Sequence, residues 1–285
     1  MHGCLDCYAQ GACGPKDSEK IVVAGNLLPK LRGELSRRHV KPAVVCLDFS
    51  SDPFQPVPEL LDRTYEVLEY LLGEGIGVIF QTRAKIPPRH LELLLAHAPL
   101  VRAIIGLVTT DRRILRIFEP HTATPQTRLR QMRQLTSGGV ATLARVDPIL
   151  PGLTDDPDTM HNLCAALAEA GMHELSAGVL VLRPALLSAL RNRLARPRIY
   201  GRLVESFEQG HNVWSSEFGG QMRVLPAAAR RRIFQWLTAI SAQYGIRVHV
   251  CGCKNPDLAG ESCNLAGPWS PRETVERQLA LFATK

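Results

Sequence analysis

The chain has 285 residues, of which 45% are hydrophobic and 21% are charged, a composition typical of soluble globular proteins. This length allows one large domain or two smaller ones. No apolar run approaches the roughly 18 residues that a membrane-spanning helix needs, so we expect no membrane association and a cytoplasmic location. The net charge of +7 permits phosphate-rich partners, although arginine-rich helix faces that keep the protein in solution would account for it as well.

Short β-branched runs alternate with amphipathic segments along the first two thirds of the chain. Near the amino end, residues 21–23 predict a small strand and residues 27–35 a short helix. Each later strand is followed by apolar residues at helical spacing, with Pro, Gly and Asp at the junctions. The expected strands are 42–49, 77–82, 101–108, 142–146 and 175–182, and the expected helices are 57–72, 88–97, 124–135, 156–170 and a segment from 184.

Five βα units in tandem predict a parallel sheet with right-handed crossovers, and therefore an open or partial barrel of the α/β class. In such folds the chemistry lies at the carboxyl ends of the strands. The last third is less regular, with a helix expected at 227–244 and a strand at 247–250. We divide the chain into a core, residues 1–200, and a helical C-terminal extension with a cysteine-rich loop, residues 201–285.

Four motifs stand at the amino end and after expected strands. They are His2-Gly3-Cys4-Leu5-Asp6-Cys7-Tyr8-Ala9, Ser50-Ser51-Asp52-Pro53-Phe54-Gln55-Pro56, Gln81-Thr82-Arg83 and Arg145-Val146-Asp147-Pro148-Ile149-Leu150-Pro151-Gly152. In this order they resemble the radical S-adenosylmethionine (SAM) superfamily, and within it the spore-photoproduct-lyase-like, or DNA repair photolyase-like, group. The resemblance covers residues 3–195 and implies a partial (β/α)6 TIM-type barrel.

The resemblance also implies cofactors and a reaction. A 4Fe-4S cluster, reduced by an electron donor such as flavodoxin or ferredoxin, would pass an electron to SAM. The resulting 5′-deoxyadenosyl radical would abstract a hydrogen atom from the substrate. The cofactors carry this chemistry, while the protein orients them and excludes water.

The amino-terminal motif is similar to the end of a Cys-x3-Cys-x2-Cys cluster loop. By this resemblance Cys4 and Cys7 are cluster ligands, and the first cysteine of the pattern would fall immediately before Met1. We therefore expect that the start was assigned late, that the first barrel strand is missing, and that the chain as written binds its cluster poorly, which would leave it inactive. Asp6 occupies a position that is usually aromatic in the family, and Tyr8 either takes over the stacking on adenine or is simply packed.

Two strand-end motifs suggest where SAM would bind. Ser51 and Asp52 match the family position that binds the methionine amine, since a short carboxylate beside a hydroxyl accepts hydrogen bonds from an ammonium group. The alternative is an Asp-Pro turn that closes the strand without any ligand. Arg83 stands where the family has a basic residue that contacts the cofactor carboxylate; the alternative is a surface ion pair.

Two further positions follow or end later strands. Thr109 or Thr110 could reach the cofactor ribose after the strand at 101–108. Arg145 lies in a strand with apolar neighbours, where it either binds the cofactor or pairs with Asp147.

One departure from the family concerns the substrate. Spore photoproduct lyase has a hydrogen-donating cysteine just before the matching Ser-Asp, and this chain has Phe49 there. Cys46 lies three residues earlier, where we expect a buried cysteine within the strand. Repair of thymine dimers is therefore doubtful, and the substrate stays open among a nucleic acid, a peptide and a small metabolite.

A second group of cysteines lies near the carboxyl end. Cys251, Cys253 and Cys263 stand in a Gly/Pro/Asn-rich loop that would suit a second iron–sulfur cluster or a zinc ion, with Cys13 or His249 as a fourth ligand. The alternative is that these thiols bind no metal. Cys164, on an Ala/Leu helix face, is expected in the core.

A second function from another class is a non-catalytic metal-binding protein with a basic surface that binds nucleic acid. Arginines cluster at two places in the chain, but no aromatic residues that stack on bases accompany them. The clusters comprise Arg191, Arg193, Arg196, Arg198 and Arg202, followed by Arg230, Arg231 and Arg232.

Overall fold

A parallel sheet of six strands forms the centre of the molecule. The computed structural model describes residues 2–7, 25–47, 51–193, 197–215 and 220–258. The sheet follows chain order, with every neighbouring pair parallel, which confirms the predicted α/β partial barrel. Its strands, in order, are β1 (Val44–Leu47), β2 (Gly77–Thr82), β3 (Val101–Gly106), β4 (Ala141–Ile149), β5 (Glu174–Val179) and β8 (Arg247–Val250).

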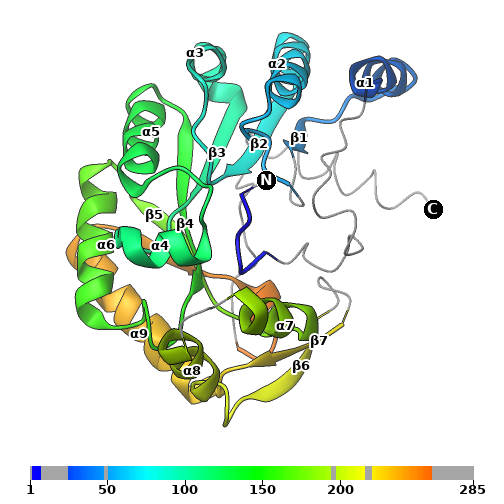
Figure 1. The fold of residues 1–285 in the computed structure, drawn as a ribbon. Coiled ribbons are helices and arrows are strands. Elements are labelled where there is room, and N and C mark those ends of the chain that lie inside the picture. Colours follow the sequence, from blue (N-terminus) through cyan, green and yellow to red (C-terminus); the bar gives the residue numbers. More distant parts are fainter. Residues whose placement is uncertain (1, 8–24, 48–50, 194–196, 216–219, 259–285) are drawn as a thin grey trace.

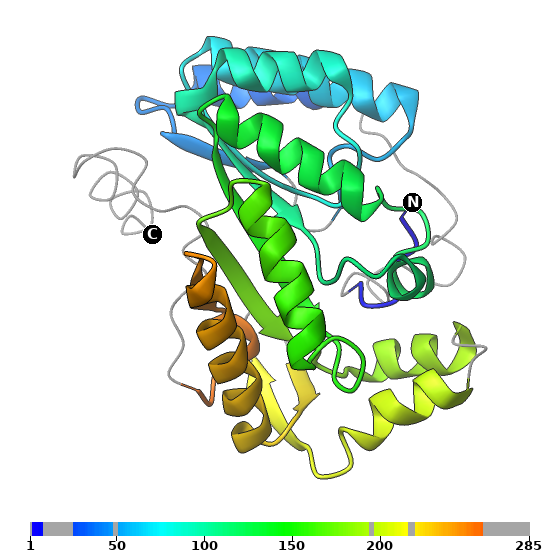
Figure 2. The ribbon, with the colours of Figure 1, turned by 90° about the vertical axis from the view of Figure 1, so that its left-hand side faces the viewer.

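Helices cover the convex face of the sheet, and the amino-terminal segment 2–7 lies on the opposite, concave side (Figures 1 and 2). Proline at the first helical position begins four of these helices, where a missing N–H costs nothing. Thr124 and Asp156 cap two of them by accepting a hydrogen bond from a backbone N–H of the first turn. The covering helices are α2 (Pro58–Gly73), α3 (Pro88–Ala96), α5 (Pro125–Ser137), α6 (Pro157–Glu169) and α9 (Ala227–Gln243).

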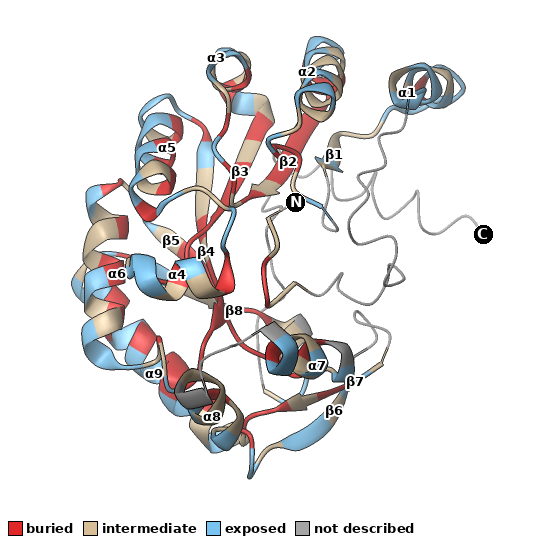
Figure 3. Ribbon diagram, in the orientation of Figure 1, coloured by how far each residue is buried: buried red, intermediate tan, exposed pale blue. Residues whose placement is uncertain are grey.

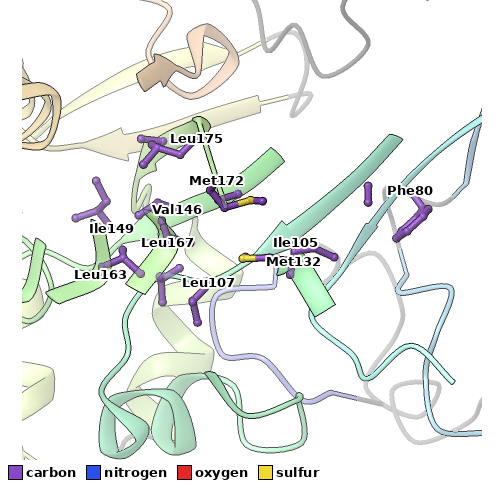
Figure 4. Close-up of a cluster of buried hydrophobic side chains, with 14 of the residues drawn as sticks. Phe80, Ile105, Leu107, Met132, Val146, Ile149, Leu163, Leu167, Met172 and Leu175 are labelled. Atoms are coloured by element: carbon purple, nitrogen blue, oxygen red, sulfur yellow. The ribbon is translucent and has the colours of Figure 1, made fainter. Parts of the chain in front are cut away.

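The core lies between the sheet and these helices. Buried residues follow the strands and the inner helix faces (Figure 3), and Ile105, Val146 and Leu175 pack beside Met132 and Leu167 (Figure 4). Each fully buried side chain of this size contributes about 1.5–3 kcal/mol to the free energy of folding. Cys164 is fully buried, as predicted. This packing fixes the strand ends from which the site is built.

Several elements were not expected from the sequence. The short helix α4 (Arg112–Phe118) follows β3, and α8 (Pro197–Glu205) follows α7 (Pro184–Arg193). The remaining unexpected elements are the antiparallel pair β6 (His211–Ser215) and β7 (Gly220–Val224), and the 3-10 helices Ala98–Leu100 and Gly252–Lys254. Helix α1 (Leu27–Ser36) was predicted; the predicted strand 21–23 lies outside the described residues.

The two edge strands of the sheet, β1 and β8, bear on two predictions from the sequence. Cys46 is exposed rather than buried, because β1 is an edge strand that pairs only with β2 among the described residues. Strand β8 comes from the proposed C-terminal extension, yet it is the sixth strand of the sheet, so the division at residue 200 stays a prediction. Among the described residues, no helix has both the length and the apolar character required to cross a bilayer.

Candidate functional site

The amino-terminal segment 2–7 is held against the loops that follow β3. The Leu5 N–H donates to the Phe118 carbonyl at 2.7 Å, and the His121 N–H donates to the His2 carbonyl at 3.2 Å. Leu5 is buried in the core cluster. Cys4 and Cys7 stand on one turn, in which the Cys7 N–H lies 3.4 Å from the Cys4 carbonyl. The two predicted cluster ligands therefore lie at the carboxyl end of the sheet.

Asp52 follows β1 and collects donors from three parts of the chain. Its carboxylate accepts hydrogen bonds from the Phe54 N–H at 2.9 Å, the Arg83 N–H at 2.8 Å and the Thr82 hydroxyl at 2.8 Å. His2 Nε2 lies 3.0 Å from Asp52 Oδ2. Burial acts to raise the pKa of Asp52, but His2 and the two backbone donors outweigh it, so the pKa lies below the ordinary value.

Arg83 lies between acidic groups of different segments. Its Nη1 is 3.0 Å from Asp6 Oδ2 and 3.4 Å from Glu119 Oε1, and its Nη2 donates to the Asp147 carbonyl at 2.7 Å. Burial alone would lower the pKa of Arg83. The surrounding acidic groups have the larger effect and raise this pKa well above its ordinary value. Arg83 therefore makes a buried ion pair, which differs from the surface ion pair that was the alternative to a cofactor contact.

Burial also governs the chemistry of Cys4. It raises the pKa of the Cys4 thiol to about 12, against the opposing effect of the Arg83 guanidinium. The thiolate is the form that ligates metals. In this arrangement Cys4 is therefore held as a thiol, and a bound cation would be needed to favour its deprotonation.

Asp147 forms a further buried charged contact of the site. Its carboxylate accepts from Arg145 Nη2 at 2.8 Å and from Lys254, which follows β8. Burial acts to raise the pKa of Asp147, but Lys254 and Arg145 together hold it well below its usual range. Arg145 thus makes the pairing with Asp147 that was one of its two predicted roles.

The remaining predicted cofactor-binding residues are Ser51, Thr109 and Tyr8. Ser51 is exposed beside Asp52 at the end of β1. Thr109 is buried after β3, and its hydroxyl accepts a hydrogen bond from the Asp111 N–H at 3.1 Å. Tyr8 lies outside the described residues.

Cys251 is buried at the end of β8, where its N–H donates to the Ala177 carbonyl. Cys13, Cys263 and the side chain of Cys253 lie outside what the structure describes, and His249 faces Glu174 at 3.4 Å. Within the described ranges, no three His, Cys, Asp or Glu side chains gather as metal ligands.

A cavity of about 400 Å³ adjoins the His2 and Asp52 pair. Most of its wall is apolar, and it lies between the loops that follow β1, β2 and α4. Its wall includes His2, Phe54, Pro56, Leu61, Pro87 and His121. The cavity gives the site an apolar side next to its charged centre.

The described residues fit the implied cofactors in kind and in place, but they do not complete either site. Cys4 and Cys7 supply two thiols on one turn, so a cluster needs at least one further ligand from outside the described residues. Asp52 is a carboxylate beside the hydroxyl of Ser51, as an ammonium group requires. Both carboxylate oxygens of Asp52 already accept hydrogen bonds from the chain, and His2 Nε2, from the separate segment, lies 3.0 Å away, so an ammonium group would have to displace one of these neighbours.

Five residues of the site were not recognised as such from the sequence: His2, Asp6, Glu119, Arg128 and Lys254. Asp6 did give a signal, because it replaces the aromatic residue of the family pattern. His2, Glu119 and Lys254 meet partners from distant parts of the chain, and Arg128 pairs with Glu119, which follows the unexpected helix α4.

The chain resembles both uncharacterised proteins and radical SAM proteins. No protein-family model matches it. It is 26% identical over 220 residues to uncharacterised proteins of Mycobacterium tuberculosis and Mycobacterium bovis, covering 73% of this chain and 65% of theirs. It is 27% identical over 170 residues to a radical SAM Nα-GlyT isomerase of Pseudomonas phage M6, covering 59% of this chain and 35% of that protein. The chain thus spans just under two thirds of its mycobacterial relatives.

Solved structures give the fold. Spore photoproduct lyase in complex with a dinucleoside spore photoproduct superimposes with a TM-score of 0.67 at 17% identity, covering 87% of this chain and 73% of that one. A mutant of the same lyase with bound SAM and the dinucleoside gives a TM-score of 0.66. The resemblance to the spore-photoproduct-lyase-like group is confirmed at the level of the fold.

Proposed function

We propose that the chain is a radical SAM enzyme. One observation carries the proposal: the segment with Cys4 and Cys7 is fastened beside Asp52, through His2, at the carboxyl end of a parallel sheet. Enzymes with this type of sheet place their reacting groups at that end. The fold likeness to spore photoproduct lyase and the sequence likeness to the phage isomerase support the same reading.

The residues of the chain would divide the work as follows. Cys4 and Cys7 would hold a 4Fe-4S cluster together with a further ligand outside the described residues. Asp52 and Ser51 would receive the amine of SAM, and Thr109 would stand near the ribose. When bound, the two cofactors supply reductive cleavage of the sulfonium and hydrogen-atom abstraction. Arg145 would orient Asp147, and the apolar wall of the cavity would limit water beside the reacting centre.

A protein reductant such as flavodoxin or ferredoxin would supply the electron. We propose a nucleic acid as the substrate class, because the net charge is +7 and the structural neighbour was solved in complex with a dinucleoside spore photoproduct. Binding of a fluorescent single-stranded oligonucleotide that weakens steeply with added salt would support this class. Equal binding at low and high salt, or none, would remove it.

Cys251, Cys253 and Cys263 form a separate part of the proposal, as ligands of a second iron–sulfur cluster or of zinc. The supporting observation is that Cys251 lies at the carboxyl end of β8, on the same side of the sheet as Cys4. Metal analysis of the purified protein and of a Cys251→Ser variant distinguishes iron from zinc.

The experiment for the main proposal is anaerobic reconstitution with iron and sulfide, followed by reduction in the presence of SAM. Because Cys4 and Cys7 supply only two thiols on their turn, we expect partial iron loading, and 5′-deoxyadenosine is measured per bound cluster. Formation of 5′-deoxyadenosine should require Cys4 and Cys7, so Cys4→Ala and Cys7→Ala should abolish it. Cys46→Ala, which removes an exposed thiol from β1, is the matched control and should retain it. Cleavage that survives Cys4→Ala and Cys7→Ala together would refute the proposal.

A further inference from the structure

The guanidinium of Arg83 joins three segments that are distant in the chain. Nη1 contacts Asp6 of the amino-terminal segment and Glu119 at the end of α4, while Nη2 donates to the carbonyl of Asp147 in β4. Its side chain is 14% exposed, and those of Asp6 and Glu119 are 7% and 1% exposed. Both Nη atoms of the guanidinium are therefore engaged by acceptors of the chain itself.

Glu119 is in turn held from its other side. Its Oε2 accepts from Arg128, which is fully buried and also donates to the carbonyls of Gly106 and Ala123. Asp6, Arg83, Glu119 and Arg128 therefore alternate in charge along a single buried row. The two inner residues, Arg83 and Glu119, each lie between two groups of opposite charge, and this arrangement offsets the cost of burying their own charges.

Gly106, at the carboxyl end of β3, leaves space for the side chain of Arg83. A Cβ added to Gly106 would lie 2.9 Å from Arg83 Cγ and 3.1 Å from Arg83 Nε. Such contacts are closer than packing allows, so the absence of a side chain at this position is what lets Arg83 lie across the end of β3.

We infer that Arg83 is a positioning residue, which fastens the segment 2–7 and its two cysteines to the carboxyl end of the sheet, with Glu119 and Arg128 holding Arg83 in place. The contacts with Asp6 and the Asp147 carbonyl set where the Cys4–Cys7 turn lies. The inference rests on contacts within the chain and does not depend on the proposed reaction. It replaces the predicted contact of Arg83 with the carboxylate of SAM.

Amide hydrogen exchange of the Leu5 and His121 N–H groups tests this directly, because these two hydrogen bonds close the segment onto the barrel. Asp6→Asn should accelerate exchange at both amides by at least about tenfold, while the Val146 amide in the core keeps its rate. Asp62→Asn, which breaks the exposed pair with Arg89, is the matched control and should change neither. Unchanged Leu5 exchange in Asp6→Asn, or equal acceleration at Val146, would overturn the inference.

A second set of variants separates positioning from ligand binding. Arg83→Met and Asp6→Asn remove the same contact, so the effect of the double variant on Leu5 exchange should be smaller than the sum of the single effects. Arg83→Lys should protect Leu5 only in part, because one ammonium group cannot span Asp6 and the Asp147 carbonyl as the guanidinium does. Additive effects, or loss of SAM binding in Arg83→Met with normal Leu5 exchange, would instead assign Arg83 to the cofactor.

Discussion

The two cysteine-bearing segments of the chain dock at the same end of the sheet in different ways. The amino-terminal segment 2–7 reaches it through two backbone hydrogen bonds and the ion pairs of His2 and Asp6. The segment 251–258 continues directly from β8. Both converge on Asp147: Arg83 donates to its carbonyl and Lys254 to its carboxylate.

The carboxyl-terminal segment also has a buried arginine of its own. Arg230 of α9 donates to the Leu225 carbonyl at 2.9 Å, to Asn255 Oδ1 at 3.0 Å and to Asp257. The Asn255 amide then donates to the Cys251 carbonyl at 2.8 Å. This segment continues directly from a strand of the sheet, whereas the amino-terminal one is attached by two backbone hydrogen bonds, the buried Leu5 and the ion pairs of His2 and Asp6. Loss of a charged contact should open the amino-terminal segment locally. At the carboxyl-terminal segment, the same kind of loss should destabilise the whole molecule.

The largest effect is expected for Arg230→Met. Removal of this guanidinium leaves the buried Asn255 Oδ1 and the Leu225 carbonyl without their donor and takes one partner from the partly exposed Asp257. At about 1–3 kcal/mol for each buried acceptor that loses its donor, the loss of unfolding free energy should be about 2–6 kcal/mol. Urea denaturation measures it. Arg231→Met, at the exposed neighbouring position, is the matched control and should stay within about 0.5 kcal/mol of the parent. Equal losses in both variants would contradict the distinction between the two segments.

The second largest loss of stability is expected for Asp147→Asn, and this loss should depend on pH. The pKa of Asp147 is lower in the folded state than in the unfolded state, so its stabilisation is present above the ordinary carboxyl pKa and is lost as pH falls through the folded value. The variant should be less stable by about 1.5–3 kcal/mol near neutral pH, the range for hydrogen bonds to charged groups. The deficit should shrink below about pH 4. A deficit that grows with acid would show the opposite linkage.

Two glycines allow the segments to be disturbed separately. Gly106→Ala would press on Arg83, and Gly178→Ala would place a Cβ 2.8 Å from Asp147 Oδ1 and 3.3 Å from Lys254 Cδ. Each should cost about 1–3 kcal/mol, as overpacking does. Exchange at the Leu5 amide should accelerate relative to the core in Gly106→Ala but not in Gly178→Ala. The reverse pattern would mean that the row of charges through Arg83 does not hold the segment.

The smallest effect on overall stability is expected for Asp6→Asn, at about 1 kcal/mol, because the released segment can be hydrated without unfolding the core. The effect of Asp6→Asn should be visible in the reactivity of the Cys4 thiol. Alkylation of Cys4, followed by mass spectrometry, should accelerate, while the buried Cys164 and Cys251 keep the slow rates of the parent. Acceleration at all three cysteines would indicate general destabilisation instead.

The sequence predicts the barrel well because its signals are local. Runs such as Val78–Phe80 and the apolar spacing in α2 and α6 each indicate an element, and their alternation indicates the parallel order. Helix α4 escaped prediction because it has only seven residues, most of them charged or β-branched. The pair β6 and β7 escaped because its strands are short and partly polar.

The site could be predicted only in outline. The motifs located Cys4, Asp52, Arg83 and Arg145 at one end of the sheet, since strand ends are visible in the sequence. The partners were not visible: Asp6 and Arg83 lie 77 residues apart, and Lys254 and Asp147 lie 107 apart. Ion pairs over such separations leave no periodic pattern in the sequence, so the partners of Arg83 and Asp147 could be identified only from the structure.

The central claim is that the Cys4–Cys7 turn stands beside Asp52 as one SAM-binding centre. Electron paramagnetic resonance of the iron-loaded, reduced protein tests it most directly, because SAM bound at the cluster changes the signal. We predict that addition of SAM changes the spectrum of the parent and of Asp62→Asn, and leaves that of Asp52→Asn unchanged. A parent spectrum indifferent to SAM, or the same response in Asp52→Asn, would contradict the account.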